Sequence, residues 1–245
     1  MRQITVKELL EAGAHFGHQT KRWCPKMRPY IFGARDGIHI IDLEQTAQRL
    51  AEACREVQQR VSQGEYVLFV GTKRQAQEVI RQEAERCHMF YANQRWLGGT
   101  LTNFQTIRRS VERLKSLEAM RTDGTFERLT KKEVLRLERE IVKLERRLGG
   151  IKEMDRLPGV VYIVDPNRER NAAAEARRMR ILSIGVVDTN TDPDVVDLVI
   201  PANDDSIKTI QLITRCIADA VLEGLRLWEE RLQDVSEQEG EAESA

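Results

Sequence analysis

The chain has 245 residues, of which 32% are charged and 5% aromatic, and 39 Lys and Arg residues balance 39 Asp and Glu residues. This length suits one sizeable core with one appended subdomain. No apolar run approaches the roughly 18 residues of a membrane-spanning helix, and the first eight residues lack the apolar segment of a secretory leader. These features exclude a membrane partner and favour a cytoplasmic protein.

The balanced total hides a segregation of charge along the chain. Residues 1–35 carry seven cations against two anions, whereas residues 183–206 carry six anions and no cation. Residues 234–245 add five further anions without a cation. A chain with this pattern presents one face that attracts polyanions and another that repels them. We expect the acidic tail, residues 232–245, to be disordered in isolation.

The first 36 residues are predicted to form a short helix followed by a basic loop. Thr5 and Glu8 have the spacing of a capping box, which predicts a helix that begins there, and Gly13 offers its end. Residues 15–36 contain two prolines and five cations, and we interpret them as an irregular loop that binds a partner.

Strands and helices then alternate, which predicts an α/β core over residues 37–101 and 151–231. Apolar runs at 38–41, 66–70, 89–91, 160–164, 182–187 and 198–200 predict strands, and residues 44–61, 74–86, 171–179 and 206–231 predict helices. Continuous apolar strands separated by helices indicate a three-layer fold, in which helices cover both faces of a parallel sheet.

Residues 102–150 interrupt this alternation with two helical patterns. Apolar residues recur every three or four positions over 104–114 and 134–148, and Thr130 with Glu133 forms a second capping box. The spacing predicts an antiparallel coiled-coil helical hairpin inserted into the core. The hairpin is either a solvated decoration or an arm that reaches a neighbouring molecule, and the charge on both of its helices favours the arm.

Three motifs offer chemistry, and each has a structural alternative. The Gly71-Thr72-Lys73 segment follows a strand, and Thr72 as the N-cap of the next helix predicts an anion-binding turn, or an ordinary strand-to-helix turn. His15, His18 and Cys24 lack the spacing typical of zinc sites. The carboxylates in the 188–194 loop suit Mg²⁺ or the capping of turns. Because no nucleophile or base accompanies these groups, we predict no catalytic residue, no metal and no cofactor.

Several ordered blocks together resemble the bacterial small-subunit ribosomal protein S-two family. In the N-terminal half they are GAHFGH (13–18), WCPKM (23–27), YIFG (30–33), GIHIIDL (37–43), FVGTK (69–73) and NQRWLGGTLTNF (93–104). In the C-terminal half they are VDTN (187–190), DPD (192–194) and IPANDD (200–205). The resemblance covers roughly residues 5–228, within which the quoted blocks lie between 13 and 205, and Ala202 stands where the family pattern leads us to expect Gly.

The resemblance implies a structural constituent of the small ribosomal subunit with a flavodoxin-like core and a protruding coiled-coil hairpin. It implies contacts with small-subunit ribosomal RNA and with neighbouring ribosomal proteins, among them the large S-one protein, and no homo-oligomer. The implied location is the ribosome, in the cytoplasm or, alternatively, in a plastid stroma.

The cations that we expect to contact RNA phosphates lie in the basic loop, near strand ends and at the base of the hairpin. They are Lys21, Arg22, Lys26, Arg28, Lys73, Arg74, Arg95, Arg108, Arg109 and Arg113. The alternative function is an enzyme or sensor for a phosphorylated small molecule, which would use the Gly71-Thr72-Lys73 turn and the 188–194 loop.

Overall fold

A five-stranded parallel sheet forms the centre of the protein, as seen in a computed structural model that describes residues 4–243. Its strands are β4 (Val67–Val70), β5 (Phe90–Ala92), β6 (Val160–Val164), β7 (Leu182–Val187) and β8 (Leu198–Pro201). The spatial order is β5-β4-β6-β7-β8, and each neighbouring pair is parallel. Numbered within this sheet, the order is 2-1-3-4-5, which is compatible with a flavodoxin-like core.

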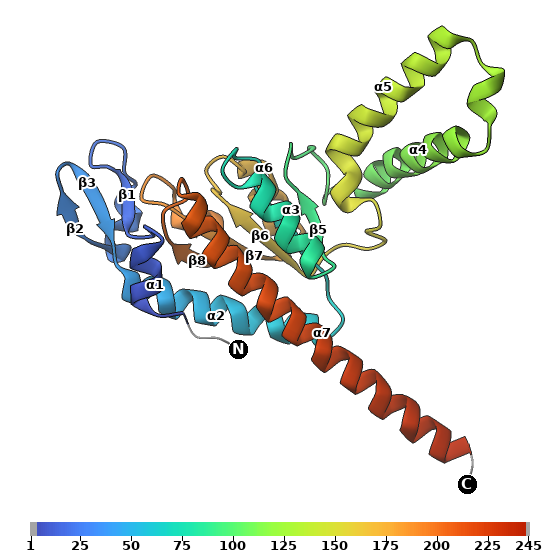
Figure 1. Cartoon of the computed structure of the whole chain (residues 1–245). Coiled ribbons are helices and arrows are strands. Elements are labelled where there is room, and N and C mark those ends of the chain that lie inside the picture. Colours follow the sequence, from blue (N-terminus) through green and yellow to red (C-terminus); the bar gives the residue numbers. More distant parts are fainter. Residues whose placement is uncertain (1–3, 244–245) are drawn as a thin grey trace.

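Helices cover both faces of this sheet, as the continuous apolar strands predicted (Figure 1). One face, which includes Phe69 and Tyr162, packs against α2 (Leu43–Val61), α3 (Gln77–Arg86) and α7 (Ile207–Glu243). The other face, which includes Leu68 and Val161, packs against α6 (Arg170–Met179) and the first and last turns of an inserted segment. Every residue of β4 and β6 is buried, because both sides of these strands meet a helix layer.

A second, antiparallel sheet occupies the N-terminal region, where we had predicted an irregular loop. After α1 (Val6–Glu11) come β1 (Phe16–Gln19), the 3₁₀ helix η1 (Pro25–Tyr30), β2 (Ile31–Arg35) and β3 (Ile38–Ile41). The strand order is β1-β3-β2. Asp36 and Gly37 make the two-residue turn between β2 and β3, both with positive φ, 52° and 77°. The prediction that β3 begins the parallel α/β pattern was therefore wrong, since β3 pairs only within this small sheet.

The inserted segment consists of α4 (Phe104–Thr122), the short η2 (Thr125–Arg128), α5 (Lys131–Leu148) and η3 (Gly149–Ile151). α4 and α5 run side by side away from the sheet (Figure 1). Leu114, Leu117 and Ile141 form a small buried cluster between them that is separate from the two clusters beside the sheet. The capping boxes at Thr5 and at Thr130 are both present.

Two predicted element boundaries differ in the structure. Helix α3 begins at Gln77 with Ala76 as its N-cap, so Thr72 does not cap it and Lys73 lies in the preceding turn. Helix α7 continues to Glu243, which gives a helical backbone to most of the tail predicted to be disordered, while residues 244 and 245 lie outside the described part. Within the described residues, no helix combines the length and apolar character needed to span a bilayer.

Candidate nucleic-acid interface

Basic side chains without partners lie in the connection between β1 and β2 of the N-terminal sheet. Lys21 and Arg22 lie in the turn after β1, and Arg28 lies in η1. All three are exposed, and none of their side chains forms a hydrogen bond or ion pair with another residue that the structure describes. Because these charges are not neutralised within the chain, they are available to phosphate groups of a partner. We call Lys21, Arg22 and Arg28 the sheet surface.

Lys26 differs from its neighbours because it is already paired. Its Nζ lies 2.8 Å from Asp192 Oδ2 and 2.6 Å from Asp194 Oδ2, and these hydrogen bonds raise the pKa of the lysine. Asp194 lies in η4 (Pro193–Val195). The contact joins the basic segment to the acidic loop after β7, so the two oppositely charged regions of the sequence meet here. An RNA contact by Lys26 stays a prediction, and this geometry favours a structural role.

A second group of cations surrounds Arg95, in the connection between β5 and α4. Arg95 and Gln94 line one side of an open groove of about 630 Å³, whose other side is α5. The basic residues that α5 contributes are Arg139, Lys143, Arg146 and Arg147. Sequence reasoning missed these four, although their helical spacing and the charge on α5 indicated one exposed basic stripe. We call Arg95 and these four residues the groove surface.

Three predicted cations lie on α4, and they differ in their partners. Arg109 is exposed and its side chain has no partner among the described residues. Arg108 donates a long hydrogen bond, 3.4 Å, to the carbonyl of Asp155. Arg113 bonds Glu140 of α5 at 3.1 Å, which links the two helices of the inserted segment. Arg109 is thus the member of this set that is most available to a partner.

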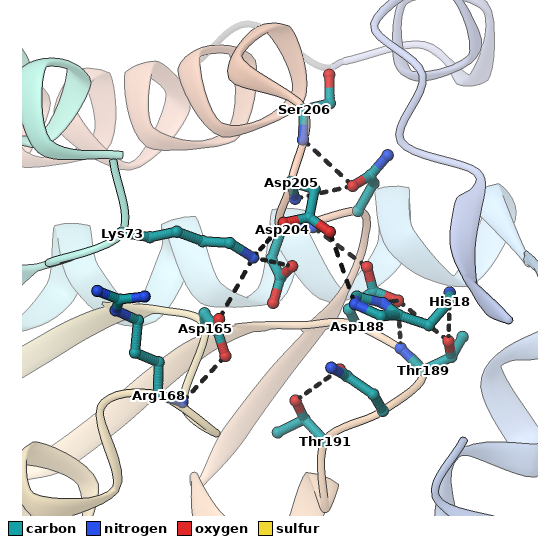
Figure 2. Close-up of polar contacts among 12 residues, drawn as sticks. His18, Lys73, Asp165, Arg168, Asp188, Thr189, Thr191, Asp204, Asp205 and Ser206 are labelled. Carbon is teal, nitrogen blue, oxygen red and sulfur yellow. Dashed lines mark hydrogen bonds and ion pairs between the residues drawn. The ribbon is translucent and has the colours of Figure 1, made fainter. Parts of the chain in front are cut away.

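Lys73 is occupied by carboxylates at the carboxyl ends of the parallel strands. Its Nζ lies 3.3 Å from Asp165 Oδ2, 2.7 Å from Asp204 Oδ1 and 2.5 Å from Asp205 Oδ1 (Figure 2). Burial lowers the pKa of this lysine, but the surrounding carboxylates, Asp204 first, raise it by more. The structure thus surrounds Lys73 with negative charge, whereas Arg74 beside it is exposed and unpaired among the described residues.

The same edge of the sheet brings His18 of β1 to Asp188 and Asp204. Burial, together with Asp165 and Asp188 nearby, raises the pKa of Asp204 to about 7, and Lys73 opposes this shift. The pKa of His18 is raised by Asp188 despite partial burial. Among the described residues, His18, Asp188 and Asp204 form the group whose potential ligand atoms lie within 4.8 Å of one another.

This grouping differs from both metal sets considered from the sequence. His15 and Cys24 do not join His18 in any cluster with metal-ligand geometry among residues 4–243. The carboxylates of the 188–194 loop are divided, since Asp188 is buried in the edge cluster while Asp192 and Asp194 bind Lys26. Asp188 also accepts hydrogen bonds from the backbone and hydroxyl of Thr189, at 2.5 and 3.1 Å.

The turn that leads into α4 is held by Glu175 of α6. One carboxylate oxygen accepts hydrogen bonds from Trp96 Nε1 at 2.9 Å and Gly99 N at 2.8 Å. The other accepts from Leu101 N at 3.0 Å and from the backbone and hydroxyl of Thr102, both at 3.1 Å. Trp96 is only 8% exposed and packs in the hydrophobic core. Glu175 therefore fixes the base of the inserted segment, beside Arg95.

Comparisons with known proteins agree with the blocks quoted above. A profile of the family described as ribosomal protein S2 matches residues 9–224. The chain belongs to the ribosomal protein S2 family. A relative, the small ribosomal subunit protein uS2 of Geotalea uraniireducens (strain Rf4), is 57% identical over 224 residues, covering 91% of this chain and 88% of the relative. The matched residues of this S2 family member include the parallel sheet, the inserted segment and the whole N-terminal sheet.

Proposed function

We propose that this protein is a structural constituent of the small ribosomal subunit and binds its ribosomal RNA through the sheet surface and the groove surface. Membership of the ribosomal protein S2 family over residues 9–224 carries this proposal. The family is structural and non-enzymatic, which agrees with the interpretation that the motifs at Gly71 and at 188–194 are not catalytic.

The sheet surface supports the proposal because its charges are unpaired. Lys21, Arg22 and Arg28 lie on a short stretch of chain supported by Met27, which is fully buried. This buried anchor fixes the backbone beside Arg28, which lowers the backbone entropy lost on binding. Such cations neutralise phosphates and release counterions, and they bind RNA by its shape rather than by its sequence.

The groove surface supports the proposal by its combination of charge and concavity. Five cations face a groove that contains one acidic residue, Glu138. Leu135 and Val142 of the same groove are 53% and 67% exposed, so it also offers apolar contacts for ribose or base. A concave basic surface follows an RNA backbone better than scattered surface charges do.

The proposal extends to the role of the inserted segment and to the neighbours of the protein on the ribosome. Residues 102–150 would be a coiled-coil arm inserted into a flavodoxin-like core formed by residues 37–101 and 151–231. The arm would contact RNA or a neighbouring ribosomal protein, and the S-one protein would be among the neighbours. The protein would act as one copy per subunit on ribosomes in the cytoplasm.

Assembly of charge-reversed variants into ribosomes tests the proposal. Lys21→Glu, Arg22→Glu and Arg28→Glu are combined in a tagged chain, and the lysate is sedimented through sucrose at low salt. A matched control combines Arg55→Glu, Lys208→Glu and Arg215→Glu, which make the same charge change on exposed positions of α2 and α7. We expect the control and the wild type to sediment with small subunits, and the sheet-surface variant to remain at the top of the gradient.

The salt dependence of the affinity of purified protein for small-subunit RNA measures the electrostatic contribution to binding separately. Each phosphate contact that is lost reduces the slope of log affinity against log salt by about one. The sheet-surface variant should therefore lose about three from that slope. An unchanged slope would exclude this surface. A wild-type chain that fails to sediment with subunits, yet shows a thermal shift with nucleotides or sugar phosphates, would favour the small-molecule alternative.

A further inference from the structure

The end of α7 extends beyond the parallel sheet and the helices that cover it (Figure 1), and it carries an apolar stripe with it. Val221 and Leu225 of this stripe pack in the core beside the sheet. Three residues further on, the indole of Trp228 lies so close to Gly64 that a Cβ there would be only 2.9 Å away. Leu232 is the next position at the same helical spacing, and its side chain is 50% exposed. The stripe therefore continues past the surface that covers it.

The same end of α7 is strongly acidic. Residues 232–245 carry five anions and no cation, and the backbone is helical as far as Glu243. We call residues 232–243 the acidic segment. Phosphate groups repel a segment of this charge, so RNA is not its partner. A partner that suits the segment has to offer apolar contacts among cations.

The groove surface has the complementary composition. None of its five cations forms an ion pair with another residue in the described range, and the partner of Arg146 is the neutral amide of Gln94, at 3.1 Å. The exposed Leu135 and Val142 of the same groove are seven residues apart, so they lie on one side of α5, two turns from each other. At the helical rise, residues 135–147 span about 18 Å and the acidic segment about 17 Å. The two surfaces thus match in charge, in apolar content and in length.

We infer that the groove surface of one copy of the protein binds the acidic segment of a second copy while the chain is free of RNA. The segment and the groove belong to different molecules, because α7 extends from the body in a different direction from α4 and α5 (Figure 1). Only two residues follow Glu243, and two extended residues reach about 7 Å. The acidic segment therefore cannot turn back to the groove of its own chain while α7 stays helical.

Charge and apolar contact have separate parts in this association. The opposite charges bring the two surfaces together and select their orientation, whereas burial of Leu232 against Leu135 and Val142 contributes affinity. Exposed ion pairs contribute little individually and are screened by salt. The contact is therefore weak and reversible, and it weakens as the salt concentration rises.

A reversible cover suits a surface that later binds RNA. While the groove surface holds an acidic segment, its cations are not available to other polyanions. RNA phosphates compete for the same cations, so RNA displaces the segment and separates the two copies. This last step rests on the proposed function, whereas the contact between two free copies does not.

Sedimentation velocity of the purified full-length chain, without RNA, tests the contact between copies. We expect species larger than the monomer at low salt, and the monomer alone at about 1 M salt, where charges are screened beyond about 3 Å. Two charge-reversed variants should each associate at least about tenfold more weakly: a groove variant, Arg139→Glu with Lys143→Glu, and a tail variant, Asp234→Lys with Glu237→Lys. The matched controls change exposed residues elsewhere by the same charge and should associate as the wild type does: Arg55→Glu with Lys208→Glu, and Glu11→Lys with Glu44→Lys.

An equimolar mixture of the groove variant and the tail variant identifies the second copy as the partner. Each variant repels itself, but in the mixture every groove meets an acidic or basic segment of opposite charge on the other chain. The mixture should therefore associate as the wild type does. Leu232→Asn, which leaves the charge unchanged, should weaken the association of the wild type severalfold, because it removes the apolar contact.

Carbodiimide crosslinking gives a second measurement on the wild type, because this reagent joins carboxylates to lysines in contact. In a mixture of isotopically light and heavy chains, we expect peptides that link residues 234–243 of one chain to Lys143 of another, and small-subunit RNA should reduce their yield. A chain that stays monomeric at low salt, association that survives in either charge-reversed variant, or a mixture that stays monomeric would overturn the inference. RNA that binds without reducing the crosslink would overturn the displacement. A chain that forms the crosslink but does not bind RNA would support the contact and contradict the proposed function.

Discussion

Replacement of Glu175 by alanine should weaken the base of the inserted segment and lower the stability of the whole chain. The carboxylate accepts five hydrogen bonds from the turn over residues 96–102. These donors include the buried indole of Trp96 and the backbone N–H groups of Gly99, Leu101 and Thr102. Without Glu175, these groups must find water or remain unpaired.

The size of the stability loss depends on which of these donors water cannot reach once Glu175 is removed. A hydrogen bond to a charged acceptor contributes about 1.5–3 kcal/mol, and a buried donor left unpaired costs about 1–3 kcal/mol. The five bonds share one carboxylate, so their contributions do not add, and Glu175 is partly exposed, so water replaces some of them. The buried indole N–H of Trp96 loses its acceptor in any case, so the cost of leaving it unpaired is the smallest loss of stability that we expect. We expect Glu175→Ala to lower the free energy of unfolding by about 3 kcal/mol.

The pH dependence identifies the charge as the cause. Burial alone would raise the pKa of Glu175, but hydrogen bonds from Trp96, Gly99, Thr102 and Leu101 lower it below the ordinary value. A carboxyl whose pKa is lower in the folded state stabilises the fold above its unfolded pKa, and this stability is lost as pH falls through the folded pKa. Since Gln does not titrate, the deficit of Glu175→Gln relative to wild type should be largest at pH 7 and should shrink in acid.

Urea unfolding followed by circular dichroism measures these differences, with amide exchange at Gly99, Leu101 and Thr102 as the local report. Glu78→Ala is the matched control, because Glu78 is exposed on α3 and bonds only Arg81 and Gln82. The control should leave the free energy of unfolding nearly unchanged, because exposed ion pairs contribute little to stability. If Glu175→Ala costs no more than Glu78→Ala and the three amides keep their protection, the proposed role of the carboxylate is refuted.

Three further variants or reagents probe other parts of the chain. Leu117→Ala empties a fully buried position between α4 and α5 and should cost about 2–4 kcal/mol, seen by amide exchange as local opening of these helices while the parallel sheet stays protected. Burial raises the pKa of Glu169, although hydrogen bonds from Thr72 oppose this shift. The contribution of Glu169 to stability is therefore lost as pH rises through its folded pKa. In urea unfolding, the free energy of unfolding of Glu169→Gln should increase relative to that of the wild type between pH 4 and pH 7. Burial also raises the pKa of Cys54 and Cys87 to about 12, so in a thiol-labelling assay at pH 8 both should react only after unfolding.

The parallel sheet could be predicted because its strands carry the signal within themselves. Residues 160–164 are apolar without a break, since β6 meets helices on both faces, and this pattern does not depend on knowing the partner strand. The N-terminal sheet carries no such signal. Its strands have four or five residues that are exposed or half-exposed at every position but one, so their apolar pattern is weak. Only the Asp36-Gly37 dipeptide, which is typical of two-residue hairpin turns, indicates a hairpin there.

The same distinction between local and long-range information decides which parts of the candidate site could be predicted from the sequence. The strand–Gly–Thr–Lys pattern at residues 67–73 predicted an anion-binding turn. In the structure, Lys73 binds the buried carboxylate of Asp204, which is 131 residues away in sequence. No spacing along the chain could show that contact. In contrast, the basic stripe on α5 that includes Arg139 and Lys143 follows from helical periodicity alone. The RNA contacts of the predicted cations stay predictions.

The arrangement of the sheet edge explains why the basic surfaces lie at the periphery. Parallel α/β sheets bind small ligands at the carboxyl ends of their strands, yet here that edge holds Lys73 among carboxylates and β1 lies against it through Thr189. The edge thus attaches one sheet to the other, and the exposed cations lie in the connection between β1 and β2 and beside α5. Substitutions at the edge should therefore change the attachment of β1, and substitutions on the basic surfaces should change RNA affinity. Because the charges of the sheet surface have no partner at the edge, the two kinds of effect should add when Arg22→Glu and Asp204→Asn are combined. A strongly non-additive effect on RNA affinity would mean that the edge positions the sheet surface for binding.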